Sequence, residues 1–157
     1  KGVSGTLKLD LAQFRELEAF ATFGSELDAV SRAQLDRGER LVELLKQSLN
    51  SPMPVEEQVI AIYAGTEGVL DDLPVSEVHR FESELLEWFR SRHAGLLVEI
   101  RDTGALPEGD AIESAVGAFK TQFVASLGGD ATGSADPTAT DAEAPGEPES
   151  DKTLQTE

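Results

Sequence analysis

The sequence contains no cysteine, and it has only one methionine, one tryptophan and one tyrosine among 157 residues. Without cysteine it has neither a disulfide framework nor a thiolate metal site. No apolar run approaches the ~20 residues that a membrane-spanning helix needs. Basic residues are scarce as well, because 13 lysines and arginines stand against 30 acids and leave a net charge of −17. Nucleic acids and anionic membrane surfaces are therefore disfavoured as partners, since both are bound through lysine and arginine.

Motifs for catalysis are also missing. Neither the phosphate loop Gly-x-x-x-x-Gly-Lys-Ser/Thr nor the dinucleotide pattern Gly-x-Gly-x-x-Gly occurs. His79 and His93 are the only histidines, and neither has a second metal ligand at a suitable spacing. The clustered carboxylates, such as Asp71-Asp72 and Glu56-Glu57, fall in expected turns or on polar helix faces, which favours a solvated surface. The sequence thus predicts no catalytic residue, no metal site and no cofactor within the chain itself.

Composition divides the chain near residue 127. Residues 128–157 contain eight acids, one base and a single large aliphatic residue, Leu154, among glycine, alanine, proline, serine and threonine. Such a segment buries too little apolar surface to offset its ordering entropy, so a disordered acidic tail is expected. Residues 1–127 form the expected folded domain. The chain opens with Lys1 in place of methionine, which favours a domain cut from a longer protein.

Apolar periodicity predicts helices over residues 7–127. Asp10 is expected to cap the first helix, Gly24 to interrupt the pattern, and Ser25 with Asp28 to begin the second helix as a capping box. Gly38 costs about 1 kcal/mol relative to alanine inside that helix, so a kink or break is expected there. The apolar residues of the second helix are expected to be Leu27, Val30, Leu41, Leu44 and Leu45.

The second half of the domain continues in the same way. Pro54 is expected to open a third helix that ends at Gly65, Ser76 to cap a fourth, and Pro107 to precede the last. The apolar positions are Val78, Phe81, Leu85, Trp88 and Phe89 in the fourth helix, Leu96–Ile100 in a short fifth segment, and Ile112, Val116, Phe119, Phe123 and Leu127 in the last.

The predicted fold class is all-α, a small helical bundle with short loops followed by the disordered tail. The only strand-like alternation, at residues 6–11, is too short to build a sheet. On the helix surfaces, Asp36 with Arg40 and Glu43 with Lys46 have the spacing of ion pairs. From composition and spacing alone, the chain is an acidic helical interaction domain.

The order of several short motifs goes further. The chain resembles the alpha subunit of the F-type, proton-translocating ATP synthase over roughly residues 1–125, and its composition and tail resemble the actinobacterial members. The segments that carry the resemblance, in this order, are Leu9-Asp10-Leu11-Ala12-Gln13-Phe14-Arg15-Glu16-Leu17, Phe23-Gly24-Ser25-Glu26-Leu27-Asp28, Arg37-Gly38, Leu44-Leu45-Lys46-Gln47, Ser51-Pro52-Met53, Glu56-Glu57-Gln58 and Ile62-Tyr63-Ala64-Gly65.

The resemblance implies that residues 1–127 are the C-terminal helical domain of a regulatory, non-catalytic subunit. The family's phosphate loop, and the arginine that reaches the neighbouring catalytic site, lie upstream of Lys1, so ATP or ADP with Mg²⁺ belongs to the full-length subunit. The implied partners are the beta subunits and the central rotor, with gamma and epsilon as its candidate subunits. The implied assembly is a hetero-oligomeric proton-transporting ATPase on the cytoplasmic face of a bacterial plasma membrane, without membrane insertion of this domain. The chain alone is expected not to be an enzyme.

The resemblance also marks two candidate sites. A turn matches the helix–turn–helix that lies nearest the rotor in the family, and it consists of Phe23, Gly24, Ser25, Glu26, Leu27 and Asp28. Its acids suit contact with basic residues of the shaft, although a plain connection between packed helices also explains it. Gln47 matches the first glutamine of Lys-Gln-x-Gln-Tyr-Ser-Pro, which lies beside the adenine of the non-catalytic nucleotide. Leu49 and Asn50 replace the second glutamine and the tyrosine.

Two alternatives remain at this point. A free-standing acidic helical adaptor explains the bundle but not the ordered motifs, and a small hydrolase with a carboxylate site lacks well-placed histidines. For the tail, extended relatives suggest a restraint of ATP hydrolysis, and simple solvation is the other interpretation.

Overall fold

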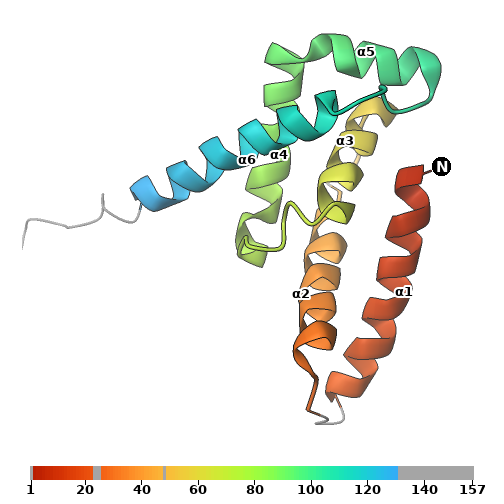
Figure 1. Ribbon diagram of the computed structural model, residues 1–157, viewed down its shortest axis with the longest axis vertical. Coiled ribbons are helices and arrows are strands. Elements are labelled where there is room, and N and C mark those ends of the chain that lie inside the picture. The colour runs from red at the N-terminus through yellow and green to blue at the C-terminus, as the bar shows by residue number, and fades with distance from the viewer. Residues whose placement is uncertain (1, 23–25, 48, 131–157) are drawn as a thin grey trace, which may run out of the picture.

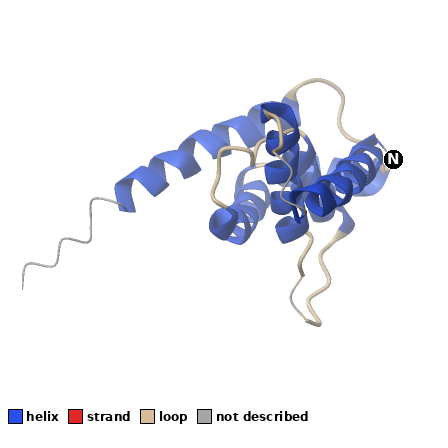
Figure 2. Ribbon diagram, turned by 90° about the horizontal axis from the view of Figure 1, so that it is seen from below, coloured by secondary structure: helices blue, strands red, loops and turns tan. Residues whose placement is uncertain are grey.

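The computed structural model describes residues 2–22, 26–47 and 49–130. Over these residues the chain contains no strand, and the prediction of an all-α bundle is confirmed. Its helices are α1 (Gly2–Thr22), α2 (Ala29–Leu44), α3 (Val55–Thr66), a 3₁₀ turn η1 (Val75–Glu77), α4 (Val78–Arg92), α5 (Ala94–Thr103) and α6 (Ala111–Asp130). α1 and α2 lie side by side and run in opposite directions, and α6 extends away from the other helices (Figure 1, Figure 2).

The first helix begins earlier than the sequence predicts. α1 is helical from Gly2, so Asp10 lies inside the helix and does not cap it. Leu7, Leu11, Phe14 and Leu17 recur at the spacing of one helix face, and all four are buried or half-buried. The apolar face therefore extends upstream of Asp10, and packing continues the helix through a residue that favours caps in isolation.

The expected break at Gly38 is wrong, because α2 runs without interruption from Ala29 to Leu44. Gly38 is buried against α1, and a Cβ atom added to it would lie 2.3 Å from Cδ2 of Phe14. The absent side chain lets the two helices approach, so packing decides in favour of glycine over intrinsic propensity. The expected place of Val30 on the apolar face is also wrong, since this residue is 77% exposed.

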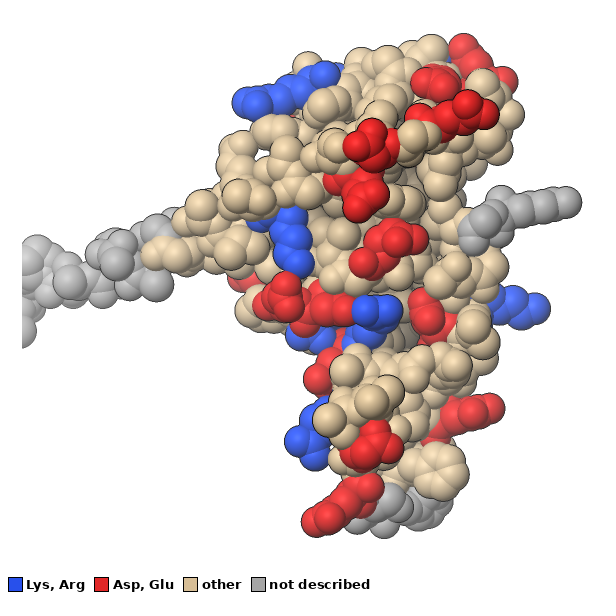
Figure 3. All heavy atoms as spheres, viewed as in Figure 1, with Lys and Arg blue, Asp and Glu red and all other residues tan. Residues whose placement is uncertain are grey.

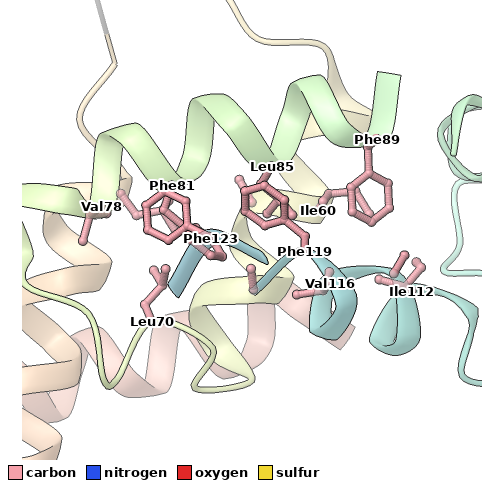
Figure 4. Close-up of a cluster of buried hydrophobic side chains, with 14 of the residues drawn as sticks. Ile60, Leu70, Val78, Phe81, Leu85, Phe89, Ile112, Val116, Phe119 and Phe123 are labelled. Carbon is pink, nitrogen blue, oxygen red and sulfur yellow. The ribbon is translucent and has the colours of Figure 1, made fainter. Parts of the chain in front are cut away.

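The main core lies between α3, α4 and α6. Phe81 of α4 is fully buried, and its ring lies 5.1 Å from those of Phe119 and Phe123 at interplanar angles of 65° and 86°. Figure 4 shows these rings together with Leu85 and Ile60 between the helices. The predicted stripe of the fourth helix is confirmed as core, since edge-to-face aromatic packing adds to the burial of apolar area.

The start of α4 differs from the prediction. Ser76 lies within η1, and the residue before α4 is Glu77, which makes no capping side-chain hydrogen bond. The turn of η1 supplies a main-chain bond in its place, from the Glu77 N–H to the Pro74 carbonyl at 3.0 Å. Farther along, α5 ends at Gly104 with φ +65°, a left-handed conformation that glycine adopts without steric cost.

The last helix continues to Asp130, three residues past the predicted division of the chain at residue 127. The expected disordered tail otherwise consists of residues 131–157, which lie outside the described residues. The division into a folded unit and a tail stays a prediction.

The turn between α3 and η1 is held by ion pairs, although its acids are expected from sequence to lie on a solvated surface. Nε of Arg37 donates to both carboxylate oxygens of Asp71, at 3.0 and 3.2 Å. Nζ of Lys120 on α6 donates to Asp72 at 2.9 Å. The two adjacent aspartates thus connect one turn to two helices.

Arg40 also binds this turn, and its expected ion pair with Asp36 is wrong. The Nε of Arg40 donates to the main-chain oxygen of Leu73 at 2.7 Å, and its Nη1 donates to the main-chain oxygen of Asp36 at 2.6 Å. The other expected surface pair, Glu43 with Lys46, is confirmed. Tertiary contact with the turn therefore redirects the Arg40 side chain away from its helical neighbour.

Candidate functional site

The first candidate site lies at the end of the molecule opposite α5, where α1 ends and α2 begins (Figure 1). Of the predicted rotor-facing turn, Phe23, Gly24 and Ser25 lie outside the described residues. Glu26 and Asp28 are exposed, and Leu27 between them is half-buried. The described part of the turn thus presents two carboxylates to solvent beside one side chain that packs inward.

Asp28 has a second role as the N-cap of α2. Its Oδ1 accepts a hydrogen bond from the Ser31 N–H at 2.8 Å, and Oδ2 accepts one from the Ser31 hydroxyl at 3.2 Å. The main-chain hydrogen bond from Ser31 is the largest cause that lowers the pKa of Asp28. The expectation that the second helix begins near Asp28 is confirmed. Part of the acidic character of this turn therefore serves to start a helix.

The position of the turn depends on close packing of α1 against α2. Phe14 fills the space above Gly38, and Gln34 of α2 donates a hydrogen bond to Gln13 of α1. Two helices in such close contact carry their connection as a fixed projection, because neither can shift without opening the buried face.

The second candidate site is a groove beside Gln47. This residue follows the end of α2, its side chain is exposed, and it lines a groove of about 430 Å³. The groove is formed by the loop after α2 on one side and by α4 on the other, with the lining residues Lys46, Gln47, Ser51, Met53, His79, Glu82, Ser83 and Leu86. An exposed carboxamide at such an edge presents both a donor and an acceptor.

The loop that carries Gln47 is tied to the start of α3. Nε2 of Gln58 donates to the main-chain oxygen of Met53 at 2.6 Å. Asn50 has φ +59°, and asparagine is among the few residue types that adopt this left-handed conformation readily. Pro54 precedes α3 directly, consistent with its expected place at the helix start. The loop therefore has a defined path on either side of Gln47.

Four charged or titratable groups form one wall of the groove. Glu43 of α2 pairs with Lys46 and also lies 3.0 Å from Nε2 of His79 (Oε1 to Nε2). The Nδ1 of His79 lies 3.6 Å from Oε2 of Glu82. The hydrogen bond from Lys46 is the largest cause that lowers the pKa of Glu43, whereas burial raises the pKa of Glu82 against the influence of His79. His79, expected to face solvent, is half exposed and paired.

A buried ion pair joins α3 to α4. Nε and Nη2 of Arg90 donate to the two carboxylate oxygens of Glu57, at 2.8 and 2.7 Å. The Glu57 side chain is only 8% exposed, so its assignment to a solvated face is wrong. This two-pronged geometry is the strong form of the arginine–carboxylate interaction. The hydrogen bond from Glu57 is the largest cause that raises the pKa of Arg90.

The described residues present little that supports catalysis. They contain no group of three or more histidine, cysteine or acidic side chains arranged to hold a metal ion. None of their helices is long and apolar enough to cross a membrane. Figure 3 shows acidic side chains distributed over the whole visible face, with basic side chains between them and no continuous basic patch. The geometry is that of a contact surface.

Comparison with known proteins identifies the domain. A family model described as "ATP synthase alpha/beta chain, C terminal domain" matches residues 1–119. The chain belongs to this family. The resemblance seen in the ordered sequence motifs is thereby confirmed, and the family match covers α1 to α5 and the first half of α6.

Relatives of this ATP synthase family place the chain on the alpha side. It is 58% identical over 125 residues to ATP synthase subunit alpha of Acidothermus cellulolyticus, covering 78% of this chain and 23% of the relative. The corresponding protein of Limosilactobacillus fermentum is 54% identical over 123 residues, with 78% and 24% covered. That of Streptomyces lividans is 52% identical over 130 residues, with 82% and 25% covered. The chain thus spans about a quarter of the length of these curated relatives.

Sequence reasoning misses the contacts that join distant parts of the chain. Glu57 and Arg90, or Glu43 and His79, are separated by more than thirty positions, and no local spacing relates them. The short-range signals at Asp28 and Glu43–Lys46 are readable because capping and i,i+3 pairing act within one helical turn.

Proposed function

We propose that the chain is the C-terminal domain of the non-catalytic alpha subunit of a proton-driven ATP synthase. In this role it packs beside beta subunits, contacts the central rotor, and takes part in ATP synthesis coupled to proton transport without doing chemistry itself. The observation that carries the proposal is the family match over residues 1–119, joined to relatives that are all named subunit alpha. The adaptor and hydrolase alternatives have no comparable support.

The nucleotide chemistry belongs, on this proposal, to the part of the subunit upstream of this domain. The described residues hold no cluster of acidic or histidine side chains that fits Mg²⁺, and the sequence has no phosphate loop. ATP or ADP with Mg²⁺ would therefore be held upstream. The assembly would be a hetero-oligomer, peripheral to the cytoplasmic face of a bacterial plasma membrane, as the resemblance implies.

Rotor contact is assigned to the turn of residues 23–28. It is supported by the exposed carboxylates of Glu26 and Asp28 at the tip of a rigid pair of helices. Because Asp28 also caps α2, its charge reversal would disturb folding together with any contact. Glu26 is the cleaner target, and Glu39, an exposed acid in the middle of α2, is a matched control.

The test places Glu26→Lys and Glu39→Lys in the full alpha subunit of the assembled enzyme and measures ATP turnover and rotation. We expect Glu26→Lys to change the rotation rate and its salt dependence, since an acidic contact with a basic shaft acts at short range. Glu39→Lys is expected to leave both unchanged. Equal behaviour of the two variants would contradict rotor contact at this turn.

Adenine contact is assigned to Gln47, whose exposed carboxamide can donate to and accept from a base edge. Leu49 stands where the family pattern has a second glutamine and is 91% exposed, so it offers only apolar contact. The experiment measures nucleotide affinity at the non-catalytic site of the intact subunit. We expect Gln47→Ala to weaken binding by about tenfold, the effect of one lost hydrogen bond to a base. Unchanged affinity would remove the assignment.

A restraint of ATP hydrolysis is proposed for the acidic tail. Since α6 continues to Asp130, the deletion that leaves the last helix whole removes residues 131–157. Faster ATP hydrolysis by the assembled enzyme after this deletion supports the proposal. No change favours solvation as the only role of the tail.

A further inference from the structure

The wall of the groove beside Gln47 contains a histidine between two carboxylates. His79 on α4 approaches Glu43 of α2 through Nε2, at 3.0 Å, and Glu82 of its own helix through Nδ1, at 3.6 Å. The Glu82 side chain is 12% exposed. Glu43 in turn accepts a hydrogen bond from Lys46, the residue directly before Gln47. A continuous line of contacts therefore runs from α4 to the loop of the candidate nucleotide site.

This arrangement has one proton too few when the imidazole is neutral and both acids are ionised. A neutral imidazole has a single N–H, and a carboxylate only accepts hydrogen bonds. If Nε2 donates to Glu43, the lone pair of Nδ1 faces the ionised oxygen of Glu82. A second proton, on Nδ1 or on Glu82, turns that repulsion into attraction. Burial raises the pKa of Glu82, which favours retention of this proton by the pair.

The other charges around His79 are engaged elsewhere. On α2, Arg40 donates to main-chain oxygens of the α3–η1 turn and of its own helix. On η1, Glu77 lies 3.6 Å from Arg80, and Arg80 also pairs with Glu84 at 2.8 Å. The titratable and charged groups that contact the imidazole are therefore Glu43 and Glu82, with Lys46 behind Glu43.

We propose that His79 is a positioning residue for the loop that carries Gln47, acting through Glu43 and Lys46, and that it holds the loop while the His79–Glu82 pair keeps its extra proton. With that proton the imidazole bridges α4 and α2, and Glu43 is fixed between His79 and Lys46. When the pair loses the proton as the pH rises, the contact between Nδ1 and Glu82 becomes repulsive and the bridge loosens. Gln47, one residue beyond Lys46, follows this change.

What the loop binds rests on the proposed function, but the positioning itself does not. The groups involved titrate as a pair, so the midpoint seen at His79 belongs to His79 and Glu82 together. Histidine is the side chain whose ordinary titration falls between about pH 5 and pH 8. The device therefore acts in the physiological range and makes the posture of the loop depend on pH.

The test follows the ¹⁵N-labelled 157-residue chain by nuclear magnetic resonance between about pH 5 and pH 8, without nucleotide. The imidazoles of His79 and His93 are the only two in the chain, so His93 serves as an internal reference. We expect the backbone amides of Lys46 and Gln47 to shift with the same midpoint as His79. His79→Gln should abolish that step, and Glu43→Gln should abolish it while the imidazole still titrates.

Glu84→Gln, an exposed acid on the same helix that pairs with Arg80, is the matched control and should leave the step in place. Unchanged amide shifts of Phe119 and Phe123 in α6 show that each variant keeps its fold. The proposal is overturned if the loop amides show no step at the His79 midpoint in the unsubstituted chain, or if the step survives in His79→Gln or Glu43→Gln. Because no nucleotide is present, such a failure leaves adenine contact through Gln47 to its own affinity measurement.

Discussion

The ring of Phe14 occupies the space in which a Cβ atom of Gly38 would lie. Such an atom would be 2.3 Å from Cδ2 and 2.4 Å from the Cβ atom of Phe14 itself, far below van der Waals contact. Phe14 is 7% exposed, so its ring has no free space to enter. The contact fixes the distance between α1 and α2, and with it the projection of the turn that joins them.

Gly38→Ala is therefore expected to destabilise the domain although alanine favours helices. The substitution gains about 1 kcal/mol of helix propensity, but the clash forces α1 away or the ring out of its rotamer, at a cost of roughly 1–3 kcal/mol. Gly117→Ala is the matched control, because nothing lies within 4 Å of its added Cβ inside α6. Urea unfolding should show a loss for the first variant and a gain for the second. A gain for both would contradict the close packing.

Removal of Arg90 should leave the buried Glu57 carboxylate without its partner. We expect Arg90→Leu to lower the free energy of unfolding by about 2 kcal/mol, less than a fully buried pair would lose. The discount applies because the Arg90 side chain is 50% exposed, whereas Glu57 is 8% exposed.

Two further variants separate the ion pair from a general loss of surface arginine. The double variant Glu57→Leu with Arg90→Leu should be more stable than Arg90→Leu alone, since no charge is then left buried without a partner. Arg101→Leu, whose pair with Glu56 spans 3.9 Å at an exposed position, should have little effect. If Arg90→Leu and Arg101→Leu cost the same, Glu57 does not depend on Arg90.

The cap of α2 should make stability depend on pH at the acidic end. Because hydrogen bonding to Ser31 lowers the pKa of Asp28 in the folded chain, its contribution is complete above the pKa of unfolded aspartate. It is lost as the pH falls below about 4 and passes through the lowered folded value. Asp28→Ala should be less stable than the unsubstituted chain at neutral pH, and the difference should shrink in acid.

Asp28→Asn keeps an acceptor oxygen for Ser31 and should retain the cap without the acid-dependent part. Asp36→Ala, an exposed acid within α2, controls for loss of negative charge. Chemical unfolding at several pH values measures all four chains. A difference between Asp28→Ala and the unsubstituted chain that stays constant down to pH values below about 3 would contradict the linkage.

The sequence is informative where structure is decided within a few residues. The aromatic stripe of α4, the left-handed end of α5 at Gly104 and the cap at Asp28 all follow from helix periodicity and local hydrogen bonding. Local rules fail where packing from another helix competes with them. The prediction for Gly38 is wrong because this glycine contacts Phe14, and that for Asp10 because the apolar face of α1 extends past it.

The candidate sites are only partly accessible from sequence. The resemblance points to Gln47 and to the turn of residues 23–28, but it does not indicate that His79 reaches Glu43 across two helices or that Asp28 is occupied by capping. Such contacts depend on the path of the chain between distant positions. They become visible only once the helices are arranged in space.

The most direct test of the proposed function is a chimera. The C-terminal quarter of the Acidothermus cellulolyticus alpha subunit, a relative 58% identical over 125 residues, is replaced by this chain, and the subunit is combined with its own beta subunits and rotor. We predict a complete assembly whose ATP turnover matches that of the parent and drops when Glu26→Lys is introduced. An alpha subunit that folds and binds nucleotide, yet fails to assemble with beta, would contradict the proposed function.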